Sequence, residues 1–166
     1  KGEAVPAIEA AFPGAVRGGK VDRALLAQEI AGAPGRLKQL ESIVHPMVVK
    51  AEIDFLRAQE ERGAKLAVLE IPLLFETDAH TRVDVSVVVS AREEVQRARV
   101  LARPGMSQAK LEALLKRQLS DTEKRARADF IVDSGTTLAD MERQIDKILD
   151  SLQGREGRVM ERLRHG

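Results

Sequence analysis

Apolar residues follow two different spacings along the 166 residues of this chain. In the first third they recur every three or four positions, which places them on one face of a helix. Three later segments are short continuous apolar runs, which are typical of strands covered on both faces in a parallel sheet. These runs predict strands at residues 66–71, 84–90 and 129–133. Pro72 ends the first of them, because proline has no N–H to donate to a sheet.

Helices are predicted from their start and stop signals. Asp, Ser and Thr at a helix start can accept hydrogen bonds from the free amides of the first turn, and proline or glycine ends a helix. The predicted caps are Asp22, Ser90, Ser107, Asp121 and Thr137. The predicted helices cover residues 4–12, 23–30, 36–62, 91–103, 107–118, a short stretch after Asp121, and 137–152.

Glycine and proline also modify the predicted elements. Pro46 lies inside the long helix at 36–62 and predicts a kink or a restart there, because its ring removes a backbone donor. Gly63 predicts the end of that helix, and the glycines within residues 16–20 predict a turn. The basic tail at 154–166 is predicted to fray.

Strands that alternate with helices indicate an α/β fold, in which right-handed crossovers connect parallel strands. The length suits one domain with a substantial core. Three strands form a thin sheet for a chain of this size.

The composition narrows the class of protein. The chain has no cysteine, which excludes disulfides and cysteine zinc sites. It has four Phe and neither Trp nor Tyr, which argues against a stacking surface for single-stranded nucleic acid. The net charge of +1 does not indicate a polyanionic partner. Without a signal peptide or an apolar run near the roughly 18 residues of a membrane span, we expect a cytoplasmic protein with no membrane partner.

Two carboxylates, Glu70 and Glu76, flank the end of the first predicted strand. Ligands of parallel sheets bind beyond the carboxyl ends of the strands, so this is a candidate ligand site. A buried strand followed by a solvated turn explains the same pattern.

Residues 97–127 form the most basic part of the chain, with nine Lys or Arg against three Asp or Glu. Arg99 and Arg103 are four residues apart and share one helix face. Arginines on helices between two strands suit a lid that closes over phosphates. A solvated helix face explains the charge equally well.

His45 precedes Pro46 at the predicted helix irregularity, where side chains often face a cleft. A lone histidine is more often structural, and no second histidine stands at metal-ligand spacing, so no metal site is predicted. The 166 residues contain neither a G-x-x-x-x-G-K-[ST] motif nor a G-x-G-x-x-G motif.

Four segments of this sequence resemble, in order, the dephospho-coenzyme A kinase family. They are Val21-Asp22-Arg23 with residues 40–46 (LESIVHP); residues 71–76 (IPLLFE); residues 85–89 with Gln96, Arg99 and Arg103; and Gln118 and Lys124 with residues 128–133 (ADFIVD). The resemblance implies a P-loop NTPase kinase fold, with helices on both sides of a parallel sheet, a helical substrate domain and a lid. It also implies phosphorylation of the ribose 3′-hydroxyl of dephospho-CoA by ATP with Mg²⁺, the last step of coenzyme A biosynthesis.

The resemblance also implies roles for particular residues. Arg99 and Arg103 would be catalytic residues in a lid at residues 97–127, and residues 14–62 would form a helical dephospho-CoA-binding subdomain. Ser134 and Gly135 would lie near the adenine of ATP. The dephospho-CoA side would comprise His45, Pro46, Pro72, Leu73, Leu74, Phe75 and Glu76. The enzyme is expected to be a monomer or a weak homo-oligomer.

The sequence departs from the family pattern at three positions and at its start. Ser134 stands where the family usually has Asn, Leu114 where a basic residue is expected, and Glu70 where Asp is frequent. Lys1 aligns with a position inside the family pattern. That position follows the P-loop and the acidic residue that looks like the general base for the ribose 3′-hydroxyl. We therefore expect residues 1–166 to be an N-terminally truncated kinase domain that is inactive alone.

Two other functions stay open at this point. One is a different small-molecule P-loop kinase, which the pairing of His-Pro with Pro-Leu-Leu-Phe-Glu disfavours. The other is a catalytically inactive module that binds a nucleotide or a protein. Nucleic-acid binding is disfavoured, because the basic segment at 97–127 lacks aromatic residues and a known docking motif.

Overall fold

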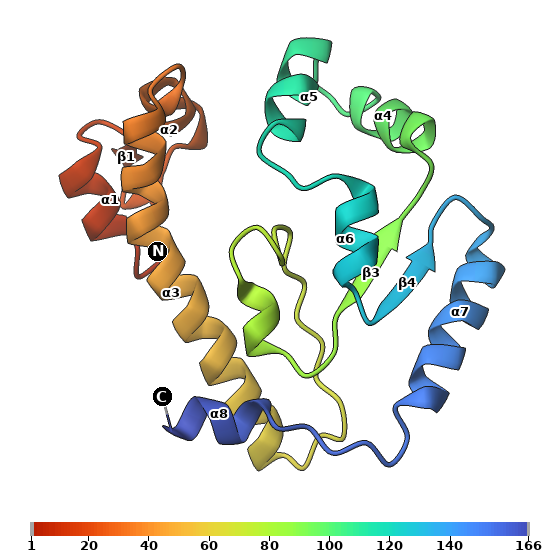
Figure 1. Cartoon of the computed structure of the whole chain (residues 1–166). Helices are drawn as coiled ribbons and strands as arrows, with labels where there is room; N and C mark the ends of the chain where they lie inside the picture. Colours follow the sequence, from red (N-terminus) through yellow and green to blue (C-terminus); the bar gives the residue numbers. More distant parts are fainter. Residues whose placement is uncertain (1, 166) are drawn as a thin grey trace. The chain divides into compact units, whose positions relative to one another are not determined.

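The structure is a computed structural model that describes residues 2–165. It divides into two compact units, Lys1–Leu69 and Glu70–Gly166, each of which is described by itself (Figure 1). None of the helices in the described part of the chain is long and apolar enough to span a bilayer.

The first unit packs short elements against one long helix. Its core is formed by Ile8, Phe12 and Ala15, and Phe12 has no exposed surface. The guanidinium of Arg36 lies 4.7 Å from the centre of the Phe12 ring and covers its face. The elements of this unit are α1 (Val5–Ala11), β1 (Val16–Arg17), β2 (Lys20–Val21), α2 (Arg23–Ile30) and α3 (Pro34–Glu61).

The predicted turn at residues 16–20 is a small antiparallel hairpin of β1 and β2. Gly18 and Gly19 form its tip with φ angles of +57° and +71°. Two successive positive φ angles match the twist of a hairpin, and glycine adopts them without strain.

The long helix α3 continues through Pro46, so the predicted restart is wrong. One missing N–H removes a single bond from a helix of 28 residues, and the turns on either side remain hydrogen-bonded. Gly63 ends this helix as predicted. Its φ is +68°, and the amides of Gly63 and Ala64 donate to the carbonyls of Glu60 and Gln59, which is the Schellman arrangement.

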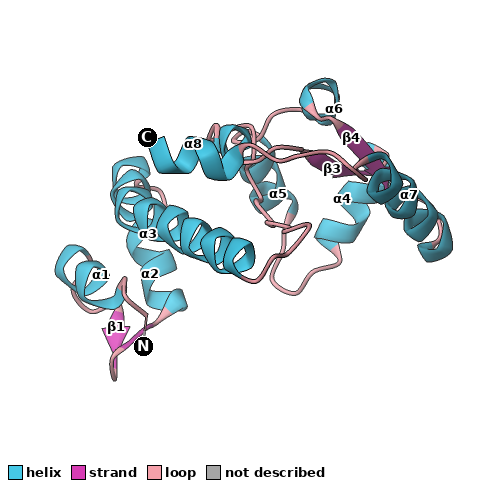
Figure 2. Cartoon of the chain, turned by 90° about the horizontal axis from the view of Figure 1, so that it is seen from below, coloured by secondary structure: helices cyan, strands magenta, loops and turns pink. Residues whose placement is uncertain are grey.

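The second unit contains a parallel pair of strands flanked by helices (Figures 1 and 2). Strands β3 (Val87–Ser90) and β4 (Phe130–Asp133) pair from Val87 with Phe130 to Ser90 with Asp133. Helix α6 packs against β3, and α7 packs against β4. The helices of this unit are η1 (Ala79–Arg82, a 3-10 helix), α4 (Glu93–Leu101), α5 (Gln108–Leu115), α6 (Asp121–Arg127), α7 (Leu138–Ser151) and α8 (Val159–His165).

These observations confirm the α/β fold with a parallel sheet and correct one of its three predicted strands. Residues 66–71 form no strand, and no described residue pairs with them in a ladder. Leu66 and Val68 are 53% and 76% exposed. An apolar run becomes a strand only where a neighbouring strand takes its N–H and C=O groups, and its sequence does not supply that neighbour.

The predicted helix caps are partly confirmed. The side chains of Asp22, Ser107 and Thr137 each accept a hydrogen bond from the first turn of the following helix. Ser90 is not a cap, because it is the last residue of β3 and α4 begins after Arg92. Asp121 is not a cap either, since Ser120 and Glu123 form a capping box at the start of α6.

The C-terminal tail is also different from its prediction. Instead of fraying, it forms α8 after a docked segment. The amide of Arg158 donates to Asp84 at 2.8 Å, and the Arg162 guanidinium donates to the Val83 carbonyl at 3.1 Å. These contacts fix the tail to the segment that leads into β3.

Candidate functional site

The candidate site lies at the carboxyl ends of β3 and β4. Both strands end at the same edge because they are parallel, and ligands of such sheets bind beyond that edge. Ser90 ends β3, and Ser134 follows directly after β4. The amide and hydroxyl of Ser134 donate to the Ser90 carbonyl at 2.7 and 3.0 Å, so the two strand ends are joined.

Arg99 connects α4 to this edge. Its guanidinium donates to the Ser134 carbonyl at 2.8 Å and to the Ser134 hydroxyl at 3.2 Å. The structure therefore brings together Arg99 and Ser134, two predicted site residues that are far apart in the sequence. Arg103 lies just after α4 and is exposed, and no contact joins it to Ser134 in the described residues.

The turn after β4 is held by its own hydrogen bonds. The Asp133 carboxylate accepts from the Gly135 amide at 2.7 Å, and the Thr136 hydroxyl donates to the Asp133 carbonyl at 2.9 Å. A Cβ atom at Gly135 would lie 3.0 Å from that carboxylate oxygen. The turn therefore has little room for a side chain at Gly135.

Glu76 is anchored at the end of the turn that begins at Pro72. Its carboxylate accepts from the Leu119 amide at 2.9 Å and lies 3.1 Å from the Lys124 ammonium. Burial raises the pKa of Glu76, but hydrogen bonds from its own amide, the Leu119 amide and Lys124 outweigh burial and leave this pKa below the ordinary 4.5. Glu76 is therefore anionic at neutral pH and ties this turn to α6.

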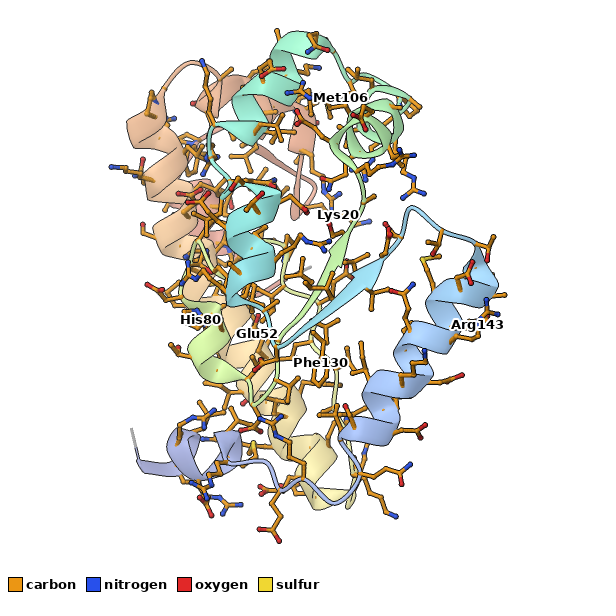
Figure 3. The ribbon with its side chains drawn as sticks, turned by 45° about the vertical axis from the view of Figure 1, so that its right-hand side comes forward. Lys20, Glu52, His80, Met106, Phe130 and Arg143 are labelled. Atoms are coloured by element: carbon orange, nitrogen blue, oxygen red, sulfur yellow. The ribbon has the colours of Figure 1, made fainter. Side chains whose placement is uncertain are left out.

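Phe75 is the buried member of the same turn. It is 4% exposed, and its ring lies 5.5 Å from the ring of His80. His80 belongs to η1 (Figure 3). The guanidinium of Arg127 lies 4.9 Å from the centre of the Phe75 ring, which is a cation–π distance. Leu73 and Leu74 contribute carbonyls that accept from Thr77 and His80, whereas Pro72 is exposed.

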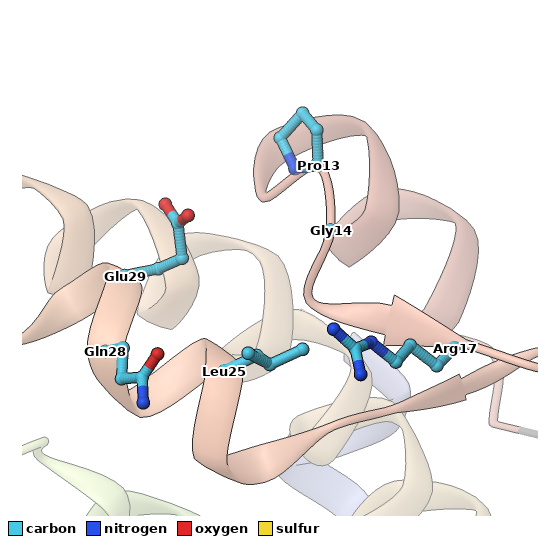
Figure 4. Close-up of a pocket in the computed structure, with 6 residues that line it drawn as sticks. All are labelled: Pro13, Gly14, Arg17, Leu25, Gln28 and Glu29. Carbon is cyan, nitrogen blue, oxygen red and sulfur yellow. The ribbon is translucent and has the colours of Figure 1, made fainter.

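His45 and Pro46 belong to the first unit, where both are exposed on α3. The first unit also has a hollow of about 400 Å³ (Figure 4). It is lined by Pro13, Gly14, Arg17, Leu25, Gln28 and Glu29, which include neither His45 nor Pro46, although all but Pro13 lie within the predicted subdomain at 14–62. Its lining includes one apolar side chain besides proline and is open to solvent, which is unlike an enclosed ligand site.

Comparison with known proteins gives the family. A family model for dephospho-CoA kinase matches residues 1–140. A dephospho-CoA kinase from Brucella melitensis is 51% identical over 154 residues, which are 93% of this chain and 77% of that protein. The chain belongs to the dephospho-CoA kinase family. A dephospho-CoA kinase from Rhodopseudomonas palustris is 53% identical over 149 residues, which cover 90% of this chain and 75% of the other.

Solved structures agree with the fold of the family. The crystal structure of TT1252 from Thermus thermophilus matches with a TM-score of 0.66 and 36% identity, over 90% of this chain and 76% of that one. A dephospho-CoA kinase from Campylobacter jejuni matches with a TM-score of 0.57 over 90% of this chain and 77% of that one. At 22% identity, the second match supports the fold alone.

The sequence patterns do not predict a polar cluster that lies next to the candidate site. Ser90 and Asp121 match the pattern of helix caps, but the Ser90 hydroxyl lies 2.8 Å from both oxygens of the Asp121 carboxylate. Gln96 and Arg125 also donate into this cluster. The sequence does contain one signal for this cluster. Ser90 stands at the carboxyl end of a predicted strand, and a polar residue at that position lies at the ligand edge.

Metal ligands are a separate question, since the family resemblance implies Mg²⁺. Within residues 2–165, no three His, Cys, Asp or Glu side chains are grouped so that they could hold a metal ion. Mg²⁺ in kinases is held by substrate phosphates, water and only one or two carboxylates, so this result concerns a cluster built from protein side chains alone.

Proposed function

We propose that this chain acts in the transfer of the γ-phosphate of ATP to the ribose 3′-hydroxyl of dephospho-CoA, which yields coenzyme A. Membership of the dephospho-CoA kinase family supports this reaction. The observation that carries the site assignment is the double contact of Arg99 with Ser134 at the carboxyl ends of the parallel strands.

On the nucleotide side, we assign ATP to the edge formed by Arg99, Ser134 and Gly135. Phosphoryl transfer needs positioning and stabilisation of negative charge more than covalent chemistry from the protein. The guanidinium groups of Arg99 and Arg103 would neutralise charge on the nucleotide, and residues 97–127 would act as the lid that excludes water. The hydrogen bonds within the turn at Asp133 support a rigid contact for the base.

On the acceptor side, we assign dephospho-CoA to residues 14–62, which include His45 and Pro46, and to the turn from Pro72 to Glu76. The anionic Glu76, held by Lys124 and the Leu119 amide, keeps that turn in one conformation. The buried Phe75, whose ring contacts His80 and the Arg127 guanidinium, also holds the turn in place. The turn would therefore present Pro72, Leu73 and Leu74 to substrate from a fixed base.

Mg²⁺ enters this proposal only as the usual companion of ATP in phosphoryl transfer. Cytoplasmic location, a monomeric or weakly associated state, and the absence of nucleic-acid and membrane partners stay predictions. The helical subdomain at 14–62 and the lid at 97–127 likewise remain proposals about organisation.

The test is a direct assay with the full-length protein, dephospho-CoA and Mg-ATP. We expect dephospho-CoA to gain one phosphoryl group while ATP becomes ADP, with no gain when either substrate is omitted. Nucleoside monophosphates serve as competing acceptors, and efficient phosphorylation of one of them instead would indicate a different small-molecule kinase. Binding of both substrates without transfer would indicate an inactive binding module.

The same assay applies to residues 1–166 alone. These residues contain no G-x-x-x-x-G-K-[ST] sequence, and the expectation is that they transfer no phosphate by themselves. Transfer by this segment alone would contradict that expectation without affecting the substrate assignment.

A further inference from the structure

A chain of hydrogen bonds leads from α6 to the contact between Arg99 and Ser134, and its first two members, Asp121 and Ser90, have no role in the function proposed above. It begins at Asp121, the first residue of α6, whose carboxylate accepts from the Ser90 hydroxyl at 2.8 Å. Ser90 is 2% exposed and Asp121 is half-buried, so water reaches this contact only from the Asp121 side. A shielded hydrogen bond to a carboxylate is stronger and more directional than one at the surface.

The chain continues through the backbone of Ser90 to Arg99. The Ser90 carbonyl accepts both the amide and the hydroxyl of Ser134, at 2.7 and 3.0 Å. The Ser134 hydroxyl then accepts from Arg99 at 3.2 Å, and the Ser134 carbonyl accepts from Arg99 at 2.8 Å. Asp121 is thus connected to the Arg99 guanidinium through two serines on neighbouring strand ends.

Two further donors fix the direction of these bonds. Arg125 donates to the Ser90 hydroxyl at 3.2 Å, so the single proton of that hydroxyl is left for Asp121. Gln96 donates to Asp121 at 3.3 Å and to the Ala91 carbonyl at 2.6 Å. Ser90 is therefore satisfied on both its donor and acceptor sides, and its hydroxyl has one orientation.

The cap of α6 does not use the Asp121 carboxylate. The capping box is formed by Ser120 and Glu123, whose side chains accept from the Glu123 and Ser120 amides respectively. The pairing of β3 with β4 uses backbone groups and does not need a carboxylate at this place. The carboxylate accepts from Ser90 and Gln96, and its contact with Ser90 leads to the ligand edge.

We propose that Asp121 is a positioning residue for the nucleotide, which acts through Ser90 and Ser134 to hold the Arg99 guanidinium in place. This inference rests on the proposed function, in which Arg99 contacts ATP. Without Asp121, the Ser90 hydroxyl loses its acceptor, the two strand ends relax against each other, and Arg99 spends less time in the orientation that binds nucleotide.

The test is steady-state kinetics on the full-length protein with each substrate varied in turn. We expect D121A and S90A to raise the KM for ATP by about three- to tenfold, the range that one well-placed hydrogen bond supplies. The KM for dephospho-CoA should stay within about twofold of wild type, since Asp121 does not reach the acceptor side. D121N retains an oxygen that can accept from Ser90 and should fall between D121A and wild type.

A matched control lies on α7, outside the lid. D146A removes an exposed carboxylate of the second unit that has no contact in the chain from Asp121 to Arg99. We expect D146A to leave both KM values unchanged. If D121A leaves both KM values unchanged as D146A does, and only the amount of folded enzyme falls, Asp121 has a structural role and the proposal is overturned.

Variants of Arg99 distinguish a failure of the positioning role of Asp121 from a failure of the proposed function. R99A should raise the KM for ATP more than D121A does, and the double variant R99A/D121A should match R99A, because Asp121 acts through Arg99. Independent effects that multiply in the double variant would overturn the positioning role while leaving the proposed function intact. Wild-type protein that fails to phosphorylate dephospho-CoA would instead refute the proposed function.

If D121A does not fold, the proposal is tested instead by measuring the affinity of S90A and S134A for a fluorescent ATP analogue. Both variants should weaken nucleotide binding by about three- to tenfold. Unchanged binding in both would overturn the proposal.

Discussion

Each of the two units is stabilised internally by a different kind of interaction. The first unit has an apolar cluster around Phe12, formed by residues that lie close together in sequence and packed on α3. The ligand edge of the second unit is held by polar side chains that are 31 to 44 residues apart, such as Ser90 with Asp121 and with Ser134. Apolar packing of this kind is sensitive to volume, whereas a polar network is sensitive to individual atoms. Substitutions in the Phe12 cluster should therefore change stability, and substitutions at the edge should change ligand binding.

The largest effect on stability is expected at Phe12. Its side chain has no exposed surface, so F12A leaves a cavity and should lower the free energy of unfolding by about 3–5 kcal/mol. F55A is the matched control, because Phe55 is 42% exposed on α3, and it should cost about 1 kcal/mol or less. Urea denaturation followed by circular dichroism measures both. Equal losses in the two variants would show that the Phe12 cluster is not the core of this unit.

A smaller effect is expected where Asp129 precedes β4. The Asp129 carboxylate accepts from the amide and hydroxyl of Ser86 at 2.8 and 2.7 Å, and Ser86 is 6% exposed. D129A leaves these buried donors without an acceptor and should cost about 1–3 kcal/mol. D146A, at an exposed position on α7, should change stability by about 0.5 kcal/mol at most. A cost for D129A no larger than that for D146A would contradict the role of the Ser86 contact.

The cap of α7 should contribute less again. The Thr137 hydroxyl accepts from the Asp140 amide at 3.2 Å, and T137A should lower the free energy of unfolding by about 1 kcal/mol. T122A changes an exposed threonine within α6 and should cost nothing, because alanine favours helix. Thermal denaturation of the two variants side by side distinguishes a capping effect from a general effect of losing a threonine.

The smallest expected effect is a pH dependence at Glu76. Its pKa in the folded protein lies below the ordinary 4.5, so its carboxylate contributes stability that is present above that pH and is lost as the pH falls through the folded value. E76Q should therefore differ from wild type by a constant amount at neutral pH and approach wild type below pH 4.5. Urea midpoints of both proteins along a pH series measure this. A difference that grows on acidification would contradict the direction of the shift.

Local signals in the sequence predicted much of the second unit and most of the first. The Schellman ending at Gly63 and the caps at Asp22, Ser107 and Thr137 depend on neighbouring residues alone, and all four are confirmed. The failures have a non-local cause. Whether an apolar run such as 66–71 becomes a strand depends on a partner far away in the sequence.

The site shows the same limit. Family resemblance pointed to Arg99 and Ser134 separately, and the structure adds that they are in contact. Ser90 and Asp121 were misassigned because each precedes or begins a helix, and cap preference is a local property. The contact between Ser90 and Asp121 follows from the packing of α6 against β3, which no window of sequence contains.

The most direct test of the central claim, that the edge at Arg99 and Ser134 is the nucleotide side, is ATP binding to R99A and R143A. Both arginines are exposed in the second unit, but Arg143 lies on α7 and pairs with Asp140. In a titration with a fluorescent ATP analogue, R99A should weaken binding by about tenfold or more, as expected for loss of a charge-assisted contact, while R143A should match wild type. Equal binding of ATP by R99A, R143A and wild type would contradict the assignment of this edge to the nucleotide.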